Sequence, residues 1–338
     1  MKKKLFRTII AAVATLCLCA CSATAPAATT DGGSDNGAPA AGDATINIAY
    51  QYGLAYAPLI VCMNNKLIEE KYKEATGADV TVTWTQMSSG ADINTGIASG
   101  TLDVGFLGVA PAISGVAKNV GYKIFTNLSG QEHGLMTSDA NIKSLADLAG
   151  SNEQIALVNI GSIQHIILGK ALSDNGYDAH ALDSNIVAMK HPDGMAALES
   201  GNVKCHLTSS PYIFKEHDNA DLHEISEINA AWPVENSFIV GVASTALHDD
   251  QPELYKALCA AISDSIDYLN GNLEEVAAMN SEFDGNTPEA ELDYLKKGVY
   301  SAKTKGIFTL ATFMSENEFI ESSVSSYSDL VFDNVSGD

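Results

Sequence analysis

Small and hydroxyl-bearing residues recur at the positions where helices are expected to begin. Such residues leave backbone N–H groups accessible and add hydroxyl groups, which is the chemistry that holds a small polar or anionic group. A single serine at a helix start is usually a cap, so the inference depends on their number and on the sheet edge they share. The set is Ser88, Ser89, Gly108, Ala110, Gly161, Ser162, Ser209 and Ser210.

Residues 50–58 read Tyr-Gln-Tyr-Gly-Leu-Ala-Tyr-Ala-Pro, which concentrates aromatic side chains around a glycine and just before a proline. Tyr50 is the last residue of a predicted strand and is expected in the core. Tyr52 and Tyr56 fall in the turn that follows, where their rings can stack on a planar ligand or enclose an aliphatic or ammonium group. Trp232 is a further aromatic candidate for this contact.

Motifs of covalent or metal chemistry are missing from the sequence. It contains no G-x-S-x-G elbow, no H-E-x-x-H, no glycine-rich phosphate loop and no dinucleotide fingerprint. His165, His191 and His206 stand near predicted loop ends, without a cysteine or carboxylate at metal-ligand spacing. Each is expected, taken alone, to be a structural or surface group. No metal, other cofactor or catalytic residue is therefore predicted.

Three further residues lie where the chain is expected to pass between two domains. Glu132, His133 and Glu235 are weaker candidates for ligand contact, and solvated hinge residues are the alternative. The cysteines of the folded part match no metal motif and are odd in number, so they are expected to be small buried hydrophobes. They are Cys62, Cys205 and Cys259.

The chain is strongly acidic, with 19 Lys+Arg against 42 Asp+Glu and a net charge of −23. Such a surface repels nucleic acid and anionic lipid. The only arginine is Arg7, which lies in the N-terminal segment described next. A bound anion would consequently be held by lysine, hydroxyl groups or backbone N–H groups, and not by a guanidinium fork.

The N-terminal segment has the layout of an export signal, with a basic head followed by an apolar stretch at residues 8–20 that is too short to remain as a membrane span. Residues 18–21 resemble a lipoprotein cleavage box, in which Cys21 would carry the lipid. The sequence thus predicts a signal peptide at 1–20, a flexible tether at 21–44, and a folded body held outside the cytoplasm by a lipid anchor.

Strands and helices alternate along the folded body, which predicts largely parallel sheets. Ser144 and Asp147 have capping-box spacing. Strands are expected at 46–50, 80–84, 102–107, 155–158, 186–189 and 203–207. The helices that follow them are expected to open at Pro58, at 88–90, at Pro111, at 161–162, at Pro192 and after Pro211.

The second half of the folded body repeats the order of predicted elements found in the first half. Residues 98–111 and 199–211 both read as helix, glycine stop, strand, and a loop that ends in proline. The alternative is a chance match, because glycine at helix ends and proline at helix starts are common in strand-helix units. If the repeat is real, two similar α/β domains face a gap with their strand C-terminal loops and helix N-termini, where open α/β sheets bind ligands.

Several motifs, taken in order, resemble the substrate-binding proteins of ABC importers in the nitrate, sulfonate and taurine group. They are the tyrosine loop, Ser-Ser-Gly at 88–90, Ser-Gly-Thr-Leu-Asp-Val-Gly at 99–105, Ile-Lys-Ser-Leu-Ala-Asp-Leu-Ala-Gly at 142–150 and Gly-Met-Ala-Ala-Leu-Glu-Ser-Gly at 194–201. The resemblance implies a two-lobed α/β fold of the periplasmic-binding-protein type II, with mainly parallel sheets and a hinge of two crossings. Its parts would be lobe 1 at 45–130, lobe 2 at 131–236, and a return to lobe 1 with C-terminal helices at 237–338.

The same resemblance implies a site and partners. The partners would be a small-molecule solute and an ABC permease, with a monomeric receptor between them and no enzymatic reaction. The ligand contacts would fall on Gln51, Tyr52, Tyr56, Ser88, Ser89, Gly108, Val109, Ala110, Gly161, Ser162, His165, Thr208, Ser209 and Ser210.

The identity of the ligand and the class of protein remain open at this point. A sulfonate, taurine-like or nitrate-like solute is the first expectation for the ligand, and an aromatic heterocycle such as a thiamine pyrimidine precursor is the second. Thiamine-pyrimidine synthases share the implied fold, but their Cys-Cys-Cys-Phe-Cys motif is absent here, so an enzyme is the weaker reading. A sensory or adhesive lipoprotein that binds a partner protein is a further alternative for the class of protein.

Overall fold

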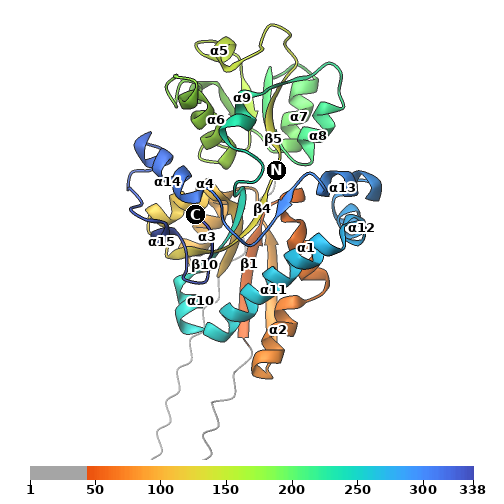
Figure 1. Cartoon of the computed structure of the whole chain (residues 1–338), viewed down its shortest axis with the longest axis vertical. Coiled ribbons are helices and arrows are strands. Elements are labelled where there is room, and N and C mark those ends of the chain that lie inside the picture. The colour runs from red at the N-terminus through yellow and green to blue at the C-terminus, as the bar shows by residue number, and fades with distance from the viewer. Residues whose placement is uncertain (1–43) are drawn as a thin grey trace, which may run out of the picture. The chain divides into compact units, whose positions relative to one another are not determined.

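The computed structural model of the chain describes residues 44–338, which form two β-sheets flanked by helices (Figure 1). The predicted signal peptide, Cys21 and the tether lie outside the described residues, except for Ala44, with which strand β1 begins. In the part that the structure describes, no helix has the length and apolar composition needed to cross a bilayer.

The first sheet shows how strand-helix alternation produces parallel pairing. Strand β1 pairs in parallel with both β2 and β3, whereas β10 lies antiparallel between β3 and β4. The six strands follow the order β11 (Val299–Tyr300), β4 (Tyr122–Gly130), β10 (Ile239–Ser244), β3 (Val104–Gly108), β1 (Ala44–Tyr50) and β2 (Val80–Gln86).

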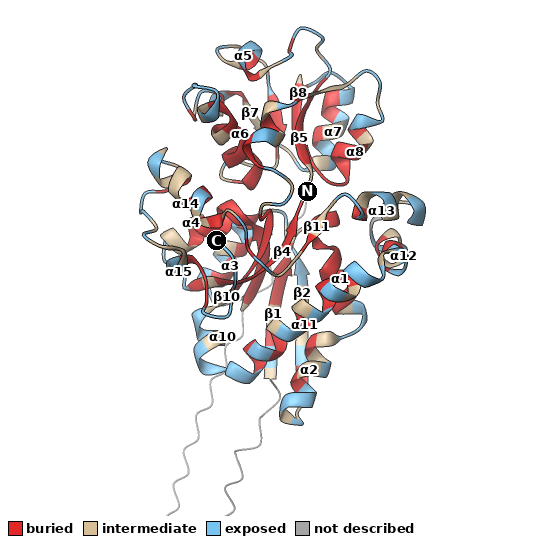
Figure 2. Ribbon diagram, in the orientation of Figure 1, coloured by how far each residue is buried: buried red, intermediate tan, exposed pale blue. Residues whose placement is uncertain are grey.

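Helices cover the first sheet and pack on one another around it. Helix α11 packs on α1 and α2, and α14 packs on α4. The helices are η1 (Leu54–Tyr56), α1 (Ala57–Asn64), α2 (Leu67–Thr76), α3 (Gly90–Ala98), α4 (Val109–Ala117), α10 (Thr245–Asp250), α11 (Pro252–Gly271), α12 (Leu273–Asp284), α13 (Pro288–Leu295), α14 (Ile307–Glu316) and α15 (Tyr327–Leu330). Figure 2 shows that buried residues fill the sheet and the helix faces turned toward it.

The second sheet has the order β7 (Ile186–Ala188), β6 (Ile155–Leu157), β8 (Cys205–Ser209), β5 (His133–Thr137) and β9 (His223–Ile225). Strands β7, β6 and β8 are parallel, and β5 is antiparallel between β8 and β9. Its helices are α5 (Leu145–Leu148), α6 (Ile163–Asp174), η2 (Asp183–Asn185), α7 (His191–Glu199), α8 (Tyr212–His217) and α9 (Glu227–Ala231).

The two sheets repeat one topology. Read from one edge, β2-β1-β3-β10-β4 matches β7-β6-β8-β5-β9 strand for strand and direction for direction. This confirms the internal repeat that the sequence predicts. The chain passes from the first sheet to the second at residues 131–132, and returns at residues 232–238. We call residues 44–130 with 239–338 the first lobe, and residues 133–231 the second lobe.

Local signals explain where the helices near the gap begin. Pro58 occupies the first turn of α1, and the Ser89 hydroxyl accepts a hydrogen bond from the Asp92 N–H at the start of α3. The predicted capping box of Ser144 and Asp147 is confirmed at the start of α5. Helix α4 begins at Val109, two residues earlier than the predicted start at Pro111, because proline is tolerated throughout the first turn.

Candidate functional site

A cavity of about 770 Å³ lies between the two lobes, within the size range of pockets for small organic ligands. The loops after β1, β2 and β3 form its wall on the first lobe, and the loops after β6, β7 and β8 form its wall on the second. Phe238 contributes from the returning crossing, and Ile239 contributes from the start of β10. Equivalent loops of the repeated topology therefore face one another across the cavity, at the carboxyl ends of the parallel strands.

The loop after β1 brings aromatic side chains into this wall. Gly53 has a φ of 127°, a conformation that favours glycine, and its carbonyl accepts the Tyr56 N–H at 3.1 Å. Tyr56 is buried, and its hydroxyl donates to Gln51 Oε1 at 3.2 Å. Tyr52 is 42% exposed and also lines the cavity. Tyr50 is only 6% exposed, which confirms the prediction that it belongs to the core.

Many of the residues predicted from helix starts and from the tyrosine loop meet in the cavity wall. They come from both lobes, which are separated in sequence by the crossing at residues 131–132. Those that line the cavity are Gln51, Tyr52, Tyr56, Ser88, Gly108, Gly161, Ser162, Ser209 and Ser210.

Other predicted residues do not line the cavity. The Ser89 hydroxyl is turned away toward Asp92, accepting from its N–H at 3.2 Å and donating to its carboxylate at 2.8 Å. The Val109 N–H donates to the Phe238 carbonyl at 2.9 Å, which joins α4 to the crossing. The predicted residues outside the lining are Ser89, Val109, Ala110, His165 and Thr208.

The weaker candidates Glu132, His133, Trp232 and Glu235 also lie outside the lining. Trp232 is 1% exposed, and its indole N–H donates to the Ser237 carbonyl at 3.2 Å, so its ring belongs to the core. His133 is buried and stacks on Phe238 with ring centroids 5.4 Å apart, and burial lowers its pKa to about 4. His133 thus supports a wall residue from behind.

Sequence reasoning missed several polar and cationic residues of the lining. The cavity extends along the groove between α3 and α4, where Lys118 lines it, and Lys190 lines it from the opposite lobe. Among residues 44–338, no aspartate or glutamate lines the cavity. The missed polar residues include Asn94, Thr95, Ser114, Lys118, Asn159, Gln164, Lys190, His191 and Tyr212.

A chain of hydrogen bonds leads from the cavity wall into the second lobe. His191 Nε2 lies 3.1 Å from Gln164 Nε2 and 3.3 Å from the Ser209 hydroxyl. On the other side of the ring, His191 Nδ1 lies 3.2 Å from His206 Nε2, and His206 Nδ1 lies 2.6 Å from Glu216 Oε1. We call His191, His206 and Glu216 the buried relay.

Burial sets the protonation of this relay. It lowers the pKa of His206 to about 3. Burial, with a smaller electrostatic effect of the neighbouring His206, also lowers the pKa of His191 to about 3, so both rings are neutral at neutral pH. It raises the pKa of Glu216 to about 8. The contact between His206 and Glu216 is therefore a hydrogen bond within a neutral pair. A histidine with so low a pKa is a weak base, so the Ser209–His191 contact does not supply an activated nucleophile.

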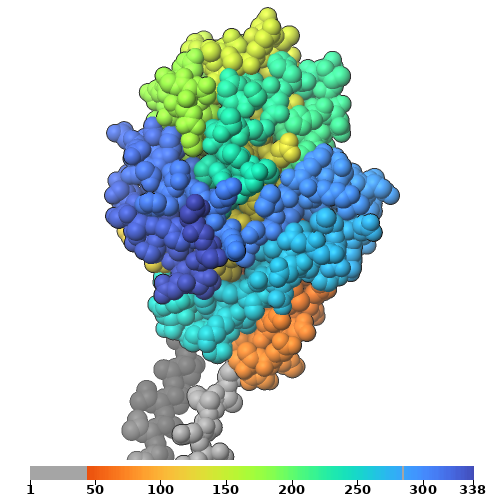
Figure 3. Space-filling model, viewed as in Figure 1, coloured from red at the N-terminus to blue at the C-terminus, as the bar shows by residue number. Residues whose placement is uncertain are grey.

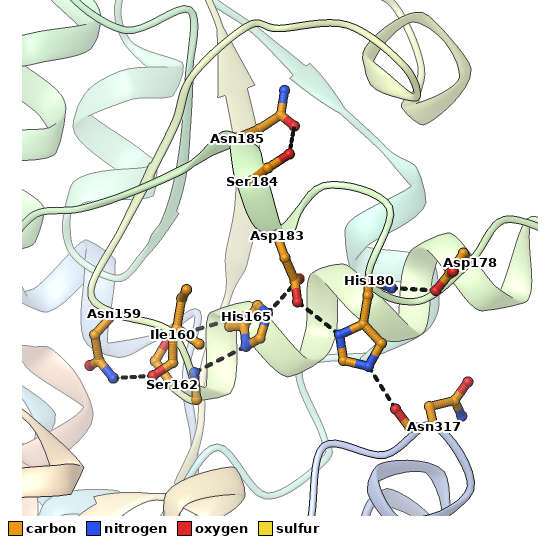
Figure 4. A network of polar contacts seen from close by, with 11 residues as sticks. Asn159, Ile160, Ser162, His165, Asp178, His180, Asp183, Ser184, Asn185 and Asn317 are labelled. Atoms are coloured by element: carbon orange, nitrogen blue, oxygen red, sulfur yellow. Dashed lines mark hydrogen bonds and ion pairs between the residues drawn. The ribbon is translucent and has the colours of Figure 1, made fainter.

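His165 supports the cavity wall from behind, through a second network (Figure 4). Its Nδ1 accepts from the Gly161 N–H at 3.0 Å, which fixes the loop after β6, and its Nε2 donates to Asp183 Oδ1 at 2.8 Å. The other carboxylate oxygen of Asp183 accepts from His180 Nδ1 at 2.8 Å. His180 Nε2 then donates to the Asn317 carbonyl at 2.7 Å.

This second network ends in a contact between the lobes, since Asn317 follows α14 of the first lobe. Both ring nitrogens of His180 face acceptors, which requires both to carry protons. Burial would lower the pKa of His180, but the carbonyl of Asn317 and the carboxylate of Asp183 raise it above its ordinary value. The Phe319 ring packs against the same histidine at 4.2 Å between centroids. Figure 3 shows the blue C-terminal part of the chain against the yellow-green part of the second lobe.

The repeated topology and the cavity between facing loops define a two-lobed solute-binding protein. A profile of the NMT1-like family matches residues 39–281, and the chain belongs to this family. The resemblance to the binding proteins of ABC importers is thereby confirmed at the level of family and fold. No curated protein sequence matches the chain. In the described part of the chain, no group of three or more histidine, cysteine or acidic residues is arranged to hold a metal ion.

Solved structures with the same fold include sulfonate-binding proteins. The alkanesulfonate-binding protein SsuA of Xanthomonas axonopodis pv. citri, bound to MOPS, is 15% identical, with 87% of this chain and 99% of that chain covered and a TM-score of 0.72. The aliphatic sulphonate binding protein SsuA of Escherichia coli is 16% identical, with coverages of 87% and 94% and a TM-score of 0.66.

A third similar structure is the CA3427 gene product of Candida albicans, described as having the generic periplasmic binding protein fold. It is 12% identical, with coverages of 86% and 97% and a TM-score of 0.67. At these identities the likeness establishes the fold of the present chain, which is the predicted two-lobed α/β fold with a hinge of two crossings.

Proposed function

We propose that the protein is the solute receptor of an ABC importer, and that it captures a small organic anion of the sulfonate class between its lobes. It would work outside the cytoplasm, attached to the membrane through lipid on Cys21, and would deliver its ligand to a permease. Closure of the two lobes would strip water from a ligand contacted on both sides.

The observation that carries this proposal is the charge of the cavity. The whole chain has a net charge of −23, yet Lys118 and Lys190 line the cavity and no described carboxylate does. A cavity without carboxylates in so acidic a protein favours an anion over a cation. It also favours a sulfonate without an amino group over taurine, whose ammonium would find no carboxylate in the lining.

The apolar residues of the lining support an organic anion over nitrate. Tyr52 on the first lobe is 42% exposed and Ile160 on the second lobe is 61% exposed. Both line the cavity from loops that are equivalent in the repeat, and they would cover an alkyl chain when a ligand is bound. A planar heterocycle is a second candidate, because Tyr212 stacks on His191 at 5.8 Å within the same wall.

The test is a comparison of ligands by thermal shift and calorimetry at pH 7, using butanesulfonate, taurine, nitrate and an aminopyrimidine. At one hundred times its dissociation constant, a true ligand should stabilise the fold by about 2.7 kcal/mol. We expect butanesulfonate to bind best, and Lys190→Gln to weaken it about tenfold. Lys73→Gln is the matched control, since Lys73 pairs with Asp79 outside the cavity. Binding of the aminopyrimidine alone would contradict the sulfonate assignment.

A further inference from the structure

We propose that the buried relay of His191, His206 and Glu216 must hold its extra proton for the site to capture the anion, so that capture takes up one proton wherever the free relay has lost it. This inference rests on the proposed function and deepens it, because it identifies how a site without arginine becomes selective for a fully ionised acid. The relay would set whether His191 offers the cavity a hydrogen-bond donor or an acceptor.

The geometry allows the relay two hydrogen-bond directions. With Glu216 ionised, His206 Nδ1–H donates to Oε1 across 2.6 Å and His191 Nδ1–H donates to His206 Nε2 across 3.2 Å. His191 Nε2 is then a lone-pair acceptor beside Gln164 and Ser209. In this direction the relay carries one negative charge.

Adding one proton at His191 Nε2 reverses every bond. His191 gives its Nδ1 proton to His206 Nε2, and His206 gives its Nδ1 proton to Glu216 Oε1, so the three groups end neutral with one proton more. His191 Nε2–H now donates toward the cavity. The amide of Gln164 can present either its oxygen or its nitrogen to this atom by rotation, and the Ser209 hydroxyl can donate or accept.

The surroundings of Glu216 place the change of direction within an accessible pH range. Glu216 is fully buried, and within the described residues its Oε2 has no hydrogen-bond partner, which disfavours the ionised form. Burial, with a smaller contribution from the charge of Glu199, raises its pKa to about 8, against a lowering effect of His217. The charged and titratable groups on the packed elements are Lys190, Asp193 and Glu199 on or next to α7, Lys215 and His217 on α8, Glu224 on β9, which pairs with His217, and Lys297 after α13, which lies over the Phe214 ring of α8.

Tight packing separates His206 and Glu216 from water, whereas His191 faces the cavity. His206 is fully buried, and a Cβ atom at Gly194 of α7 would come within 2.6 Å of His206 Nε2, so only glycine lets the helix cover the bond to His191. A proton therefore reaches Glu216 through the two rings, and the entry point is the atom that faces the cavity.

The sign of the pH dependence follows from these two states. Below pH 8 the relay is neutral and donates, which suits an anion. Above pH 8 it carries a negative charge and accepts, which repels one. Affinity for a sulfonate should be constant from pH 6 to 7.5, and should then fall by up to tenfold per pH unit, since one proton is linked to each ligand.

The first experiment measures butanesulfonate binding by calorimetry from pH 6 to 9.5, because the sulfonate itself does not titrate in this range. We expect the decline above pH 8 in the wild type, and proton uptake approaching one per ligand at pH 9 in buffers of different ionisation enthalpy. In Glu216→Gln the affinity should vary by less than about twofold over the same range. A flat wild-type profile, or an undiminished slope in Glu216→Gln, would overturn the relay.

The second experiment needs no ligand and no variant. Nitrogen NMR of the free protein labelled in histidine reports which ring nitrogen carries the proton. We expect His191 and His206 to change from Nε2–H to Nδ1–H together, with a midpoint near pH 8. Unchanged tautomers between pH 6 and 9.5 would overturn the relay. Failure of butanesulfonate to bind at pH 7, with this tautomer change present, would count against the proposed ligand alone.

Discussion

Ser88 and Ser89 are adjacent in the chain, yet their hydroxyl groups do different things. Ser88 is exposed to the cavity, whereas Ser89 caps α3 through the Asp92 N–H and lies outside the lining. Alternation along an extended segment explains the difference, because successive side chains point to opposite sides. The pair therefore separates a binding contribution from a folding contribution at neighbouring positions.

The first prediction uses this pair. Ser88→Leu should lower affinity for butanesulfonate at least tenfold, because it fills part of the cavity, while the free energy of unfolding changes by less than about 0.5 kcal/mol. Ser89→Ala should cost about 1 kcal/mol of stability through loss of the cap and leave affinity unchanged. Calorimetry and urea unfolding measure the two quantities. Equal affinities in wild type and Ser88→Leu would mean that the ligand lies elsewhere.

Helix α6 and the segment after α14 form one contact between the lobes, which is centred on Phe319. Its ring lies 4.2 Å from His180 and 5.3 Å from His165, and a Cβ atom at Gly169 of α6 would approach it to 2.5 Å. A helix that carries cavity loop 159–162 at its N-terminus is thus held against the first lobe along its length. Loosening this packing should favour separation of the lobes.

The second prediction is that Phe319→Ala weakens butanesulfonate binding although Phe319 is not a lining residue. If the contact stabilises closed lobes by about 1.4 kcal/mol, its loss lowers affinity about tenfold. Tyr268→Ala is the matched control, since Tyr268 packs within the first lobe on α11. Small-angle scattering should show a larger radius of gyration for the unliganded Phe319→Ala protein. Loss of affinity in both variants would indicate a general loss of stability instead.

The order of strands and helices was predictable because each parallel unit carries its own signals. The six expected strands correspond to β1, β2, β3, β6, β7 and β8. Strand-helix alternation could not predict that β5 and β10 run antiparallel, because each of these strands follows a crossing from the other lobe. Their direction depends on the fold as a whole, and local periodicity contains no information about it.

The cavity wall was predictable in part, for a similar reason. Glycine and serine at helix starts indicate the loops, so Ser88, Gly161 and Ser209 were found. Lys190 and His191 were missed because a lysine and a lone histidine have no distinctive local pattern. The repeat contained the needed signal: the loop after β7 is equivalent to the loop after β2, which holds Ser88. Gln164 lies within α6 and Lys118 directly follows α4. Whether such residues face the cavity depends on the packing angles of the helices, which the local sequence does not contain.

The distribution of charge over the whole molecule opposes the local charge of its cavity. The net charge of −23 repels an approaching anion at long range, while Lys118 and Lys190 attract it at short range. Salt separates the two effects, because the screening length falls from about 30 Å at 0.01 M to about 8 Å at 0.15 M. At the higher salt an anion at the cavity entrance is influenced mainly by groups in the cavity wall.

The third prediction is that the association rate of butanesulfonate rises when ionic strength increases from 0.01 to 0.15 M, opposite to ordinary electrostatic steering. Screening removes the repulsion of distant carboxylates before it removes the attraction of the two lysines. In Lys118→Gln/Lys190→Gln the rate should be slower at both salts and should rise by a larger factor, since only repulsion remains to be screened. Stopped-flow fluorescence of the tyrosines near the cleft would follow the reaction. A rate that falls with salt in the wild type would show that the cavity lysines control the approach from long range.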